Sequence, residues 1–229
     1  MDTIHILRRV KLFEGIAETD LASLLRCLGS YEQGYSKGDF IVLEGDETSQ
    51  VGILLAGTAW EVREDYRGER TIISRLAPAD IFGEVFACAQ LEYSPVTIEA
   101  ASDCRVLFVN YQKIIRTCPG SCIFHDMLIK NMLRLIAEKI LQLNKKIEYL
   151  HIKSLRGRIS AFLLDFYSDT GSGSFTISLD RAGLADYLNA DRSALSRELS
   201  RMRDKGLIEY NKNNFRIIDF DELHNCAGR

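Results

Sequence analysis

The sequence lacks any long apolar run. No stretch approaches the roughly 18 consecutive apolar residues that typify a membrane-spanning helix. The first ten residues, which include Asp2, Arg8 and Arg9, are too polar for a signal peptide. We therefore expect a cytoplasmic protein without a membrane partner.

Histidine is also scarce, and the usual catalytic motifs are missing. The four histidines, His5, His125, His151 and His224, are dispersed along the chain, and no P-loop or metal-spaced triad occurs. An enzyme needs an acid, a base or a nucleophile that converge on one site. The sequence offers no such set, so we do not expect an enzyme.

The six cysteines show no disulfide framework. In a reducing compartment most of them are expected to be buried thiols. Cys118 and Cys122, with His125 one turn further on, form the one close group of soft ligands. A redox, metal or haem switch is one interpretation, because a helix N-terminus lowers the pKa of a thiol. The alternative is that both cysteines are small buried hydrophobic residues, since the C-x3-C spacing is loose for a metal site.

The longest regular pattern runs from Ser121 to Leu150 and predicts a single helix that begins at a Ser121 N-cap. Its apolar residues alternate at spacings of four and three, which is the seam of a coiled coil. The seam comprises Ile129, Leu133, Ile136, Ile140, Leu143, Ile147 and Leu150. A second apolar line, Leu128, Met132 and Leu135, predicts that the start of the helix also packs on a domain. Burial in one large core is the alternative, but polar flanks such as Lys139 and Gln142 favour a parallel homodimer.

Charge is distributed unevenly. The chain to Gly120 has 12 basic and 18 acidic residues, whereas the remainder has 17 basic and 14 acidic residues. The positive balance of the second half points towards a polyanionic partner, and a solvated, Lys-rich helix face is the alternative.

Short β-rich runs between turn residues occupy Tyr31 to Val109, after a helix predicted at Asp20–Leu28 with Thr19 as its cap. Such spacing predicts an antiparallel roll, barrel or sandwich.

Beyond Ser154, which can cap a further helix, two helices are predicted at Asp180–Leu188 and Arg192–Lys205. Only Asn189-Ala190-Asp191 separates them, and two strands around Lys212-Asn213-Asn214 follow. This order predicts a winged helix-turn-helix. Two packed helices with a solvated basic face are the alternative.

Several features together resemble the CRP/FNR family of bacterial transcription regulators, from about Leu12 to Ile218. They are Phe82-Gly83-Glu84, the Gly-Asp turns at 38–39 and 45–46, the long helix, and the segment Asp-Arg-Ser-Ala-Leu-Ser-Arg at 191–197. The resemblance implies an α+β fold: an antiparallel, jelly-roll-like β-roll (residues 1–118), a dimerisation helix (119–152) and a winged helix-turn-helix domain (153–229).

The resemblance also implies an effector pocket at Gly83, Glu84, Ser94, Leu143 and Asn144. Cyclic-AMP-binding members place an Arg and a small hydroxyl residue where this chain has Ser94 and Pro95. The phosphate clamp is therefore missing, and cyclic AMP is not the expected effector. Iron-sulfur members carry cysteines ahead of the roll, whereas the first cysteine here is Cys27. The effector is left unknown, with haem or another small molecule as candidates.

In the predicted recognition helix, Arg192 and Arg197 are assigned to bases or phosphates, and Ser193 and Ser196 to either. Arg201, Arg203 and Lys212 are assigned to phosphates. The expected function is a homodimeric regulator that binds a two-fold symmetric operator in double-stranded DNA under effector or redox control, with RNA polymerase as a partner if it activates. The alternatives are a cyclic-nucleotide-responsive regulator and a regulatory module that does not bind DNA.

Overall fold

The computed structural model describes residues 3–47, 49–116, 124–177 and 179–228. The chain divides into two compact units, which we call the first unit (Met1–Ala137) and the second unit (Glu138–Arg229). The boundary falls inside one long helix, α5 (Phe124–His151), so each unit contains part of it. The three-part division expected from the sequence remains a prediction.

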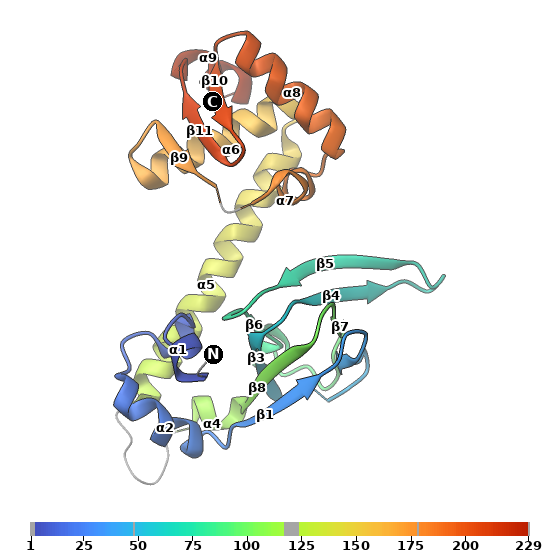
Figure 1. Cartoon of the computed structure of the whole chain (residues 1–229), viewed down its shortest axis with the longest axis vertical. Coiled ribbons are helices and arrows are strands. Elements are labelled where there is room, and N and C mark those ends of the chain that lie inside the picture. Colours follow the sequence, from blue (N-terminus) through green and yellow to red (C-terminus); the bar gives the residue numbers. More distant parts are fainter. Residues whose placement is uncertain (1–2, 48, 117–123, 178, 229) are drawn as a thin grey trace. The chain divides into compact units, whose positions relative to one another are not determined.

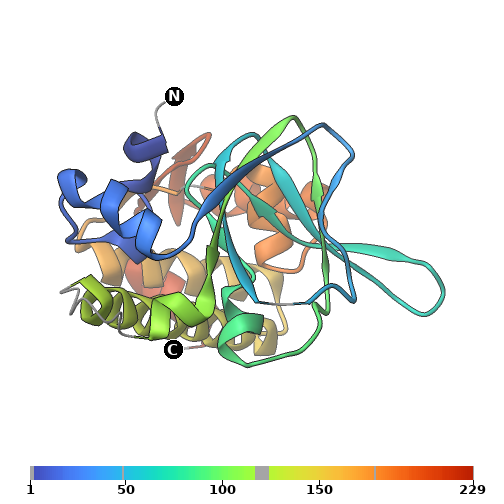
Figure 2. The same cartoon turned by 90° about the horizontal axis from the view of Figure 1, so that it is seen from below.

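The first unit is built on a roll of two antiparallel four-stranded sheets (Figure 1). One sheet has the order β1 (Tyr31–Tyr35), β8 (Cys104–Asn110), β3 (Gln50–Ala56), β6 (Ile81–Phe82). The other has the order β2 (Phe40–Val42), β7 (Thr97–Ala100), β4 (Ala59–Glu64), β5 (Arg70–Leu76). The β4–β5 hairpin extends from the roll in both views (Figures 1 and 2). The antiparallel roll expected from the sequence is confirmed.

Strand β8 is buried on both of its faces because its side chains alternate between two cores. Val106 and Phe108 belong to a core between the sheets, whereas Leu107 and Val109 belong to a core under the N-terminal helices. Gly57 makes the turn before β4 possible. Its φ is +88°, and a Cβ there would lie 2.7 Å from the sulfur of Cys104.

Helices cover the second of these cores. They are α1 (Thr3–Leu7), the 3-10 turn η1 (Lys11–Phe13), α2 (Glu18–Cys27), α3 (Glu84–Cys88), α4 (Tyr111–Ile115) and the start of α5. Leu128 and Met132 of α5 are buried in this core, and Leu135 packs against it. This confirms the predicted packing of the second apolar line on a domain.

The N-terminal half of α5 is also held by polar contacts within the first unit. The Asn131 side chain donates hydrogen bonds to the backbone oxygens of Leu12 (3.0 Å) and Glu14 (2.9 Å). Arg134 forms an ion pair with the Glu14 carboxylate at 3.2 Å. These contacts fix which face of the helix is turned away from the core.

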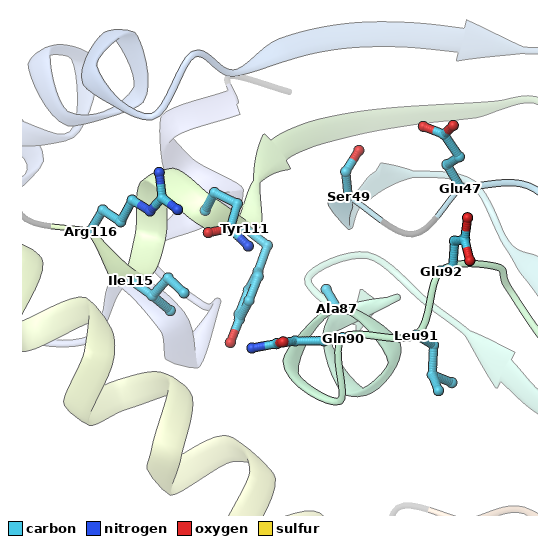
Figure 3. A pocket seen from close by; sticks show the side chains of 10 residues that line it. Glu47, Ser49, Ala87, Gln90, Leu91, Glu92, Tyr111, Ile115 and Arg116 are labelled. Carbon is cyan, nitrogen blue, oxygen red and sulfur yellow. The ribbon is translucent and has the colours of Figure 1, made fainter.

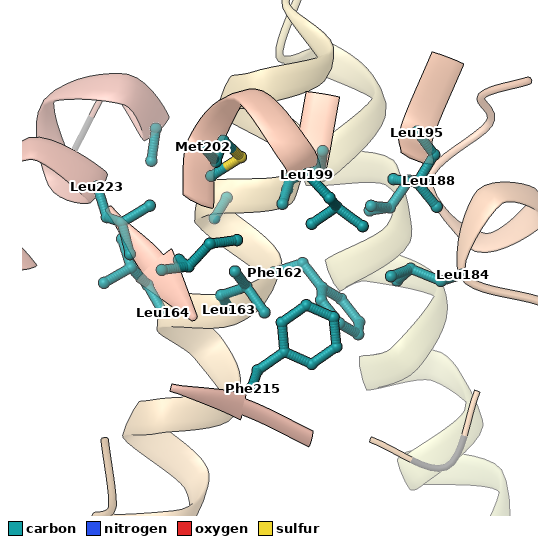
Figure 4. Packing of buried hydrophobic residues seen from close by; sticks show 14 of the residues in the cluster. Phe162, Leu163, Leu164, Leu184, Leu188, Leu195, Leu199, Met202, Phe215 and Leu223 are labelled. Carbon is teal, nitrogen blue, oxygen red and sulfur yellow. The ribbon is translucent and has the colours of Figure 1, made fainter. Parts of the chain in front are cut away.

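The second unit has one core, and Figure 4 shows side chains from several helices meeting in it. Phe162 and Leu163 of α6 meet Leu184 of α7 and Leu199 of α8. A three-stranded antiparallel sheet of order β10-β11-β9 covers it. The elements are α6 (Leu155–Thr170), β9 (Ser174–Thr176), α7 (Arg181–Tyr187), α8 (Arg192–Asp204), β10 (Ile208–Asn211), β11 (Asn214–Ile217) and α9 (Phe220–Ala227).

The first helix prediction was wrong in its cap. Helix α2 begins at Glu18 after Ala17, which makes no side-chain capping bond, so Thr19 lies inside the first turn. The predicted start of the long helix at Ser121 lies outside the described residues. None of the individual β-rich runs predicted within the range 31–109 corresponds to β1 or β6, and no helix was predicted at α1, α4 or α9.

Candidate nucleic-acid interface and effector site

The helix-turn-helix is positioned by caps and a tight turn. Asp180 caps α7 by accepting from the N–H of Gly183 at 2.8 Å, and Asp191 caps α8 by accepting from Ala194 at 2.9 Å. Between them Asn189 adopts the left-handed conformation, with φ +49°. Asparagine tolerates that conformation better than most residues. The cap at Asp191 and the left-handed turn at Asn189 agree with the sequence prediction, whereas Asp180 was predicted as the first residue of the helix and is its cap instead.

Arg158 of α6 secures the same turn from the inside of the second unit. Its guanidinium donates to the backbone oxygens of Leu188 (2.7 Å) and Asn189 (3.0 Å). These are carbonyls at the end of α7, where a helix leaves acceptors without internal partners. Sequence reasoning missed this arginine, because its role depends on how α6 packs on α7.

Helix α8 separates its apolar and polar faces. Leu195, Leu199 and Met202 are fully buried in the core. Arg192 and Arg197 lie on the exposed face at the N-terminal end of the helix. A recognition helix contacts base edges with N-terminal residues of this kind. The structure therefore brings the predicted contacts of α8 together on one surface.

Two of the predicted contact residues have hydroxyls that already make local hydrogen bonds. Ser193 Oγ donates to Asp191 Oδ1 at 2.5 Å and accepts from the Arg197 guanidinium at 3.1 Å. Ser196 Oγ donates to the backbone oxygen of Arg192 at 3.0 Å. The hydrogen bond from Ser193, aided by that from the Ala194 amide, holds the pKa of Asp191 below its usual value. Ser193 is thus placed to orient Arg197.

Glu198 organises the middle of the helix. It accepts from Arg156 of α6 at 2.6 Å and pairs with Arg201 at 3.3 Å, and its side chain is only 13% exposed. Arg201 remains 68% exposed, and its contact with a phosphate stays a prediction.

Two arginines from α7 and α8 pack against an aromatic ring of the wing, the hairpin formed by β10 and β11. The Arg181 guanidinium lies 5.1 Å from the centre of the Tyr210 ring and donates to the Lys212 backbone oxygen at 3.3 Å. Arg203 lies 5.9 Å from the same ring. Cation–π contacts of this geometry stabilise exposed arginines. Arg181 was not among the predicted contact residues, although its place at the start of a helix beside a basic wing was a readable signal.

The roll contains a cavity of about 170 Å³. Five aromatic rings line it, from Tyr31, Tyr35, Phe82, Phe86 and Phe108. The predicted effector residues Gly83 and Ser94 are among its lining residues, and Gly83 has a φ of +78°. Glu84 is buried next to Gly83 but does not line the cavity. Leu143 and Asn144 are exposed residues of the second unit, and their role in effector binding remains a prediction.

A wider hollow of about 570 Å³ lies beside α3 and α4 (Figure 3). Figure 3 shows Glu47 and Glu92 on one side of it and Arg116 on the other. Burial raises the pKa of Tyr111, which also hydrogen-bonds to Cys88. Nothing in the sequence analysis pointed to this hollow.

The proposed redox or metal site is only partly described. Cys118 and Cys122 lie outside the described residues. His125 is buried, and its Nε2 lies 3.0 Å from the Lys113 backbone oxygen. Burial raises the pKa of Cys88, Cys104 and Cys226, so these thiols are protonated at neutral pH. Within the described ranges no three metal-ligating side chains come together.

Within the described part of the chain, no helix is both long and apolar enough to cross a membrane.

Two family models match the chain. The cyclic nucleotide-binding domain matches residues 32–119, and the Crp-like helix-turn-helix domain matches residues 157–226. The chain is 26% identical over 163 residues to the "Probable transcriptional regulator flp" of Lacticaseibacillus casei, covering 71% of this chain and 65% of that protein. The chain thus spans slightly less than two thirds of that relative's length.

It is 24% identical over 200 residues to the transcriptional activator protein FnrA of Stutzerimonas stutzeri, which covers 84% of this chain and 78% of that protein. The crystal structure of the Thermus thermophilus catabolite activator protein matches with a TM-score of 0.53 at 18% identity, over 95% of this chain and 98% of that one. The roll matches the cyclic nucleotide-binding model, and the winged helix-turn-helix that follows it matches the Crp-like model. The chain therefore belongs to the CRP/FNR family of transcription regulators, with a DNA-binding helix-turn-helix domain.

Proposed function

We propose that the protein acts as a homodimer that binds a two-fold symmetric operator and whose DNA affinity is set by an effector in the roll. The observation that carries this proposal is the exposed apolar stripe on α5. Leu133, Ile140 and Leu143 are 66%, 52% and 60% exposed, and Ile147 and Leu150 are 51% and 44% exposed.

An exposed stripe of large aliphatic side chains is costly in water, and contiguous patches of this kind mark interaction sites. The 4-3 spacing supports a second copy of α5 as the partner, because knobs-into-holes packing buries such a seam. Ile129 and Ile136, the remaining seam residues, are half-buried. All seven seam positions thus keep some accessible surface, in contrast to Leu128 and Met132.

A dimer provides two copies of α8. Recognition helices of two-fold related subunits enter successive major grooves about 34 Å apart, so a palindromic operator is expected. Arg192 and Arg197 are proposed to reach base edges, with Arg201, Arg203 and Lys212 on phosphates. Ser193 and Ser196 are proposed to support this surface. RNA polymerase is an additional partner if the protein activates transcription.

Effector control requires only a modest free-energy difference. A ligand that binds one arrangement of the dimer better than another shifts the population, and a coupling of about 1–3 kcal/mol is typical. The cytoplasm is the compartment in which such a regulator meets DNA in a bacterium.

The dimer is tested by placing charges in the stripe. The double variant Ile140→Asp/Leu143→Asp is expected to sediment as a monomer, because a seam cannot bury carboxylates without partners. The matched control is Ile72→Asp, since Ile72 is 58% exposed on the β5 hairpin. A wild-type chain that sediments as a monomer at micromolar concentration, or a double variant that stays dimeric, contradicts the homodimer.

DNA binding is tested separately by gel retardation with promoter fragments at low salt. We expect retardation of fragments with two half-sites and loss of retardation as salt rises. Absence of retardation under all these conditions, with a dimer in solution, contradicts the operator proposal.

A further inference from the structure

The cavity in the roll has no positive charge to hold a phosphate. Among the described residues that line it there is no Lys, Arg or His, whereas the carboxylates of Asp46 and Glu47 are present. The Ser94 hydroxyl donates to the backbone oxygen of Val96 at 2.7 Å, so it is already used. An anion here meets two negative charges and no charge-assisted donor.

The walls of the cavity are aromatic and tightly arranged. Tyr31 stacks on Phe108 with ring centres 5.3 Å apart, and Phe82 meets Phe108 edge-on at 6.3 Å. Gly52 makes this possible, because a Cβ there would overlap the Phe82 ring. Aromatic faces and edges are favourable partners for another ring or for a cation.

The volume limits the ligand. A cavity of about 150 Å³ lined by apolar side chains accommodates benzene, whereas sites for larger ligands usually measure about 300–1,000 Å³. At about 170 Å³ the roll cavity has room for one ring with a short substituent. A nucleotide exceeds it.

One residue that lines this site carries a polar atom without a partner. The side-chain oxygen of Gln50, a lining residue, is buried and accepts no hydrogen bond within the described part of the chain. A buried acceptor in that state is unfavourable, and a side-chain rotation that turns the Gln50 amide into the cavity would let a ligand N–H or O–H group satisfy it. Burial, with Tyr31 nearby, raises the pKa of Tyr35, so its hydroxyl stays neutral at the cavity wall.

From these four features we infer that the roll binds a small neutral or cationic molecule of about one ring, with an N–H or O–H group that donates to Gln50. This inference rests on the proposed function, in which the roll holds the effector. The expected ligand is smaller than a nucleotide and, unlike a phosphate-bearing nucleotide, carries no negative charge.

The test measures the binding of matched one-ring probes to the full chain by protein-observed NMR titration. Benzyl alcohol and benzylamine carry the donor, toluene lacks it, and benzoate carries a negative charge. We expect both donor probes to shift roll resonances, toluene to bind several-fold more weakly, and benzoate to bind at least about tenfold more weakly, as does cyclic AMP. Benzoate or cyclic AMP binding as tightly as benzyl alcohol overturns the inference, and so does the absence of binding by every probe.

Two variants locate the site. Gln50→Met removes the acceptor at similar size, so the ratio of benzyl alcohol to toluene affinity should fall to about one, with the melting temperature unchanged or higher. Its control is Gln33→Met on the neighbouring exposed strand β1, which should leave that ratio unchanged. Val42→Phe, which fills the cavity from the half-exposed strand β2, should abolish binding of all probes. An unchanged affinity ratio in Gln50→Met, or unchanged binding in Val42→Phe, contradicts the inference.

These measurements need no DNA, so the two proposals fail separately. If the chain dimerises and retards operator DNA but binds no probe, the ligand inference alone is wrong. If the donor probes bind to a chain that is a monomer, the regulator proposal fails and the ligand site stands.

Discussion

At the scale of single residues, the exposed end of α8 is organised by one chain of hydrogen bonds. Asp191 accepts from Ser193, and Ser193 accepts from Arg197. A long arginine side chain loses rotamer entropy when it binds, and an arginine already held in one orientation loses less. Ser193 is therefore expected to act through Arg197 rather than on a base of its own.

A double-mutant cycle tests this role. Arg197→Ala should lower specific operator affinity by about 1–3 kcal/mol without affecting dimerisation. Ser193→Ala alone should weaken binding, but it should add almost nothing in the Arg197→Ala background, because the two residues act as one unit. Operator affinity from fluorescence anisotropy gives the coupling.

The control for that cycle is Ser196→Ala, because the Ser196 hydroxyl bonds to the Arg192 backbone and not to Arg197. Its effect should add to that of Arg197→Ala. Additive effects of Ser193→Ala and Arg197→Ala would mean that Ser193 contacts DNA independently.

The same hydrogen bonds give α8 a pH dependence with a defined sign. Because the pKa of Asp191 is lower in the folded chain than in the unfolded chain, its cap stabilises α8 fully above the unfolded value. That stability is lost as pH falls through the lower folded value. The cap is therefore intact at neutral pH.

At the scale of elements, α6 and α7 start in the same way but differ in what surrounds them. The third residue of each is a glycine whose N–H bonds to the N-cap, Gly157 to Ser154 and Gly183 to Asp180. A Cβ at Gly157 would lie 2.6 Å from Ile152 Cγ2 and 2.8 Å from the Cys226 backbone oxygen. At Gly183 the nearest atoms are 3.4 Å away.

This pair predicts opposite outcomes for one substitution. Gly183→Ala should be neutral or stabilising by up to about 1 kcal/mol, because alanine favours the helix. Gly157→Ala should instead destabilise the chain by about 1–3 kcal/mol, because the backbone of α9 must move to avoid overpacking. Denaturant unfolding of both variants checks this, and equal stabilities would show that α9 yields without cost.

Elements with local signals were predictable from the sequence. Ser154, Asp180 and Asp191 cap their helices through residues two or three positions away, so the chain alone reveals them. Helix α9 also had such a signal, since Asp219 accepts from the N–H of Glu222. It was overlooked because no long periodic segment follows.

Elements that depend on distant partners were not predictable. Strand β1 is mostly exposed and contains Gly34, and it exists because it pairs with β8, which begins almost 70 residues later. The aromatic lining of the roll cavity has the same origin, since β1, β6 and β8 bring Tyr31, Phe82 and Phe108 together. Only the Gly83 and Ser94 positions could be predicted, from the family pattern.

At the scale of the whole molecule, net charge conceals where DNA can bind. The chain carries a net charge of −3, yet the part from Ser121 onward has 17 basic and 14 acidic residues. Proteins that neutralise phosphates release counterions, and log K falls linearly with log salt in proportion to the number of phosphates contacted. The slope therefore counts contacts irrespective of the overall charge.

The number of phosphate contacts distinguishes binding by one helix-turn-helix domain from binding by two. A dimer on a complete operator contacts twice as many phosphates as one subunit, so its salt slope should be about twice that of the Ile140→Asp/Leu143→Asp variant. Arg201→Ala should lower the dimer slope by about two, one contact per subunit, while leaving sequence preference intact. Arg67→Ala, at an exposed turn of the roll, should leave the slope unchanged. Anisotropy titrations from low to physiological salt measure these slopes. Equal slopes for the wild type and the Ile140→Asp/Leu143→Asp variant would mean that only one helix-turn-helix engages DNA at a time. The proposal that dimerisation through α5 is needed for operator binding would then be wrong, even if the dimer exists.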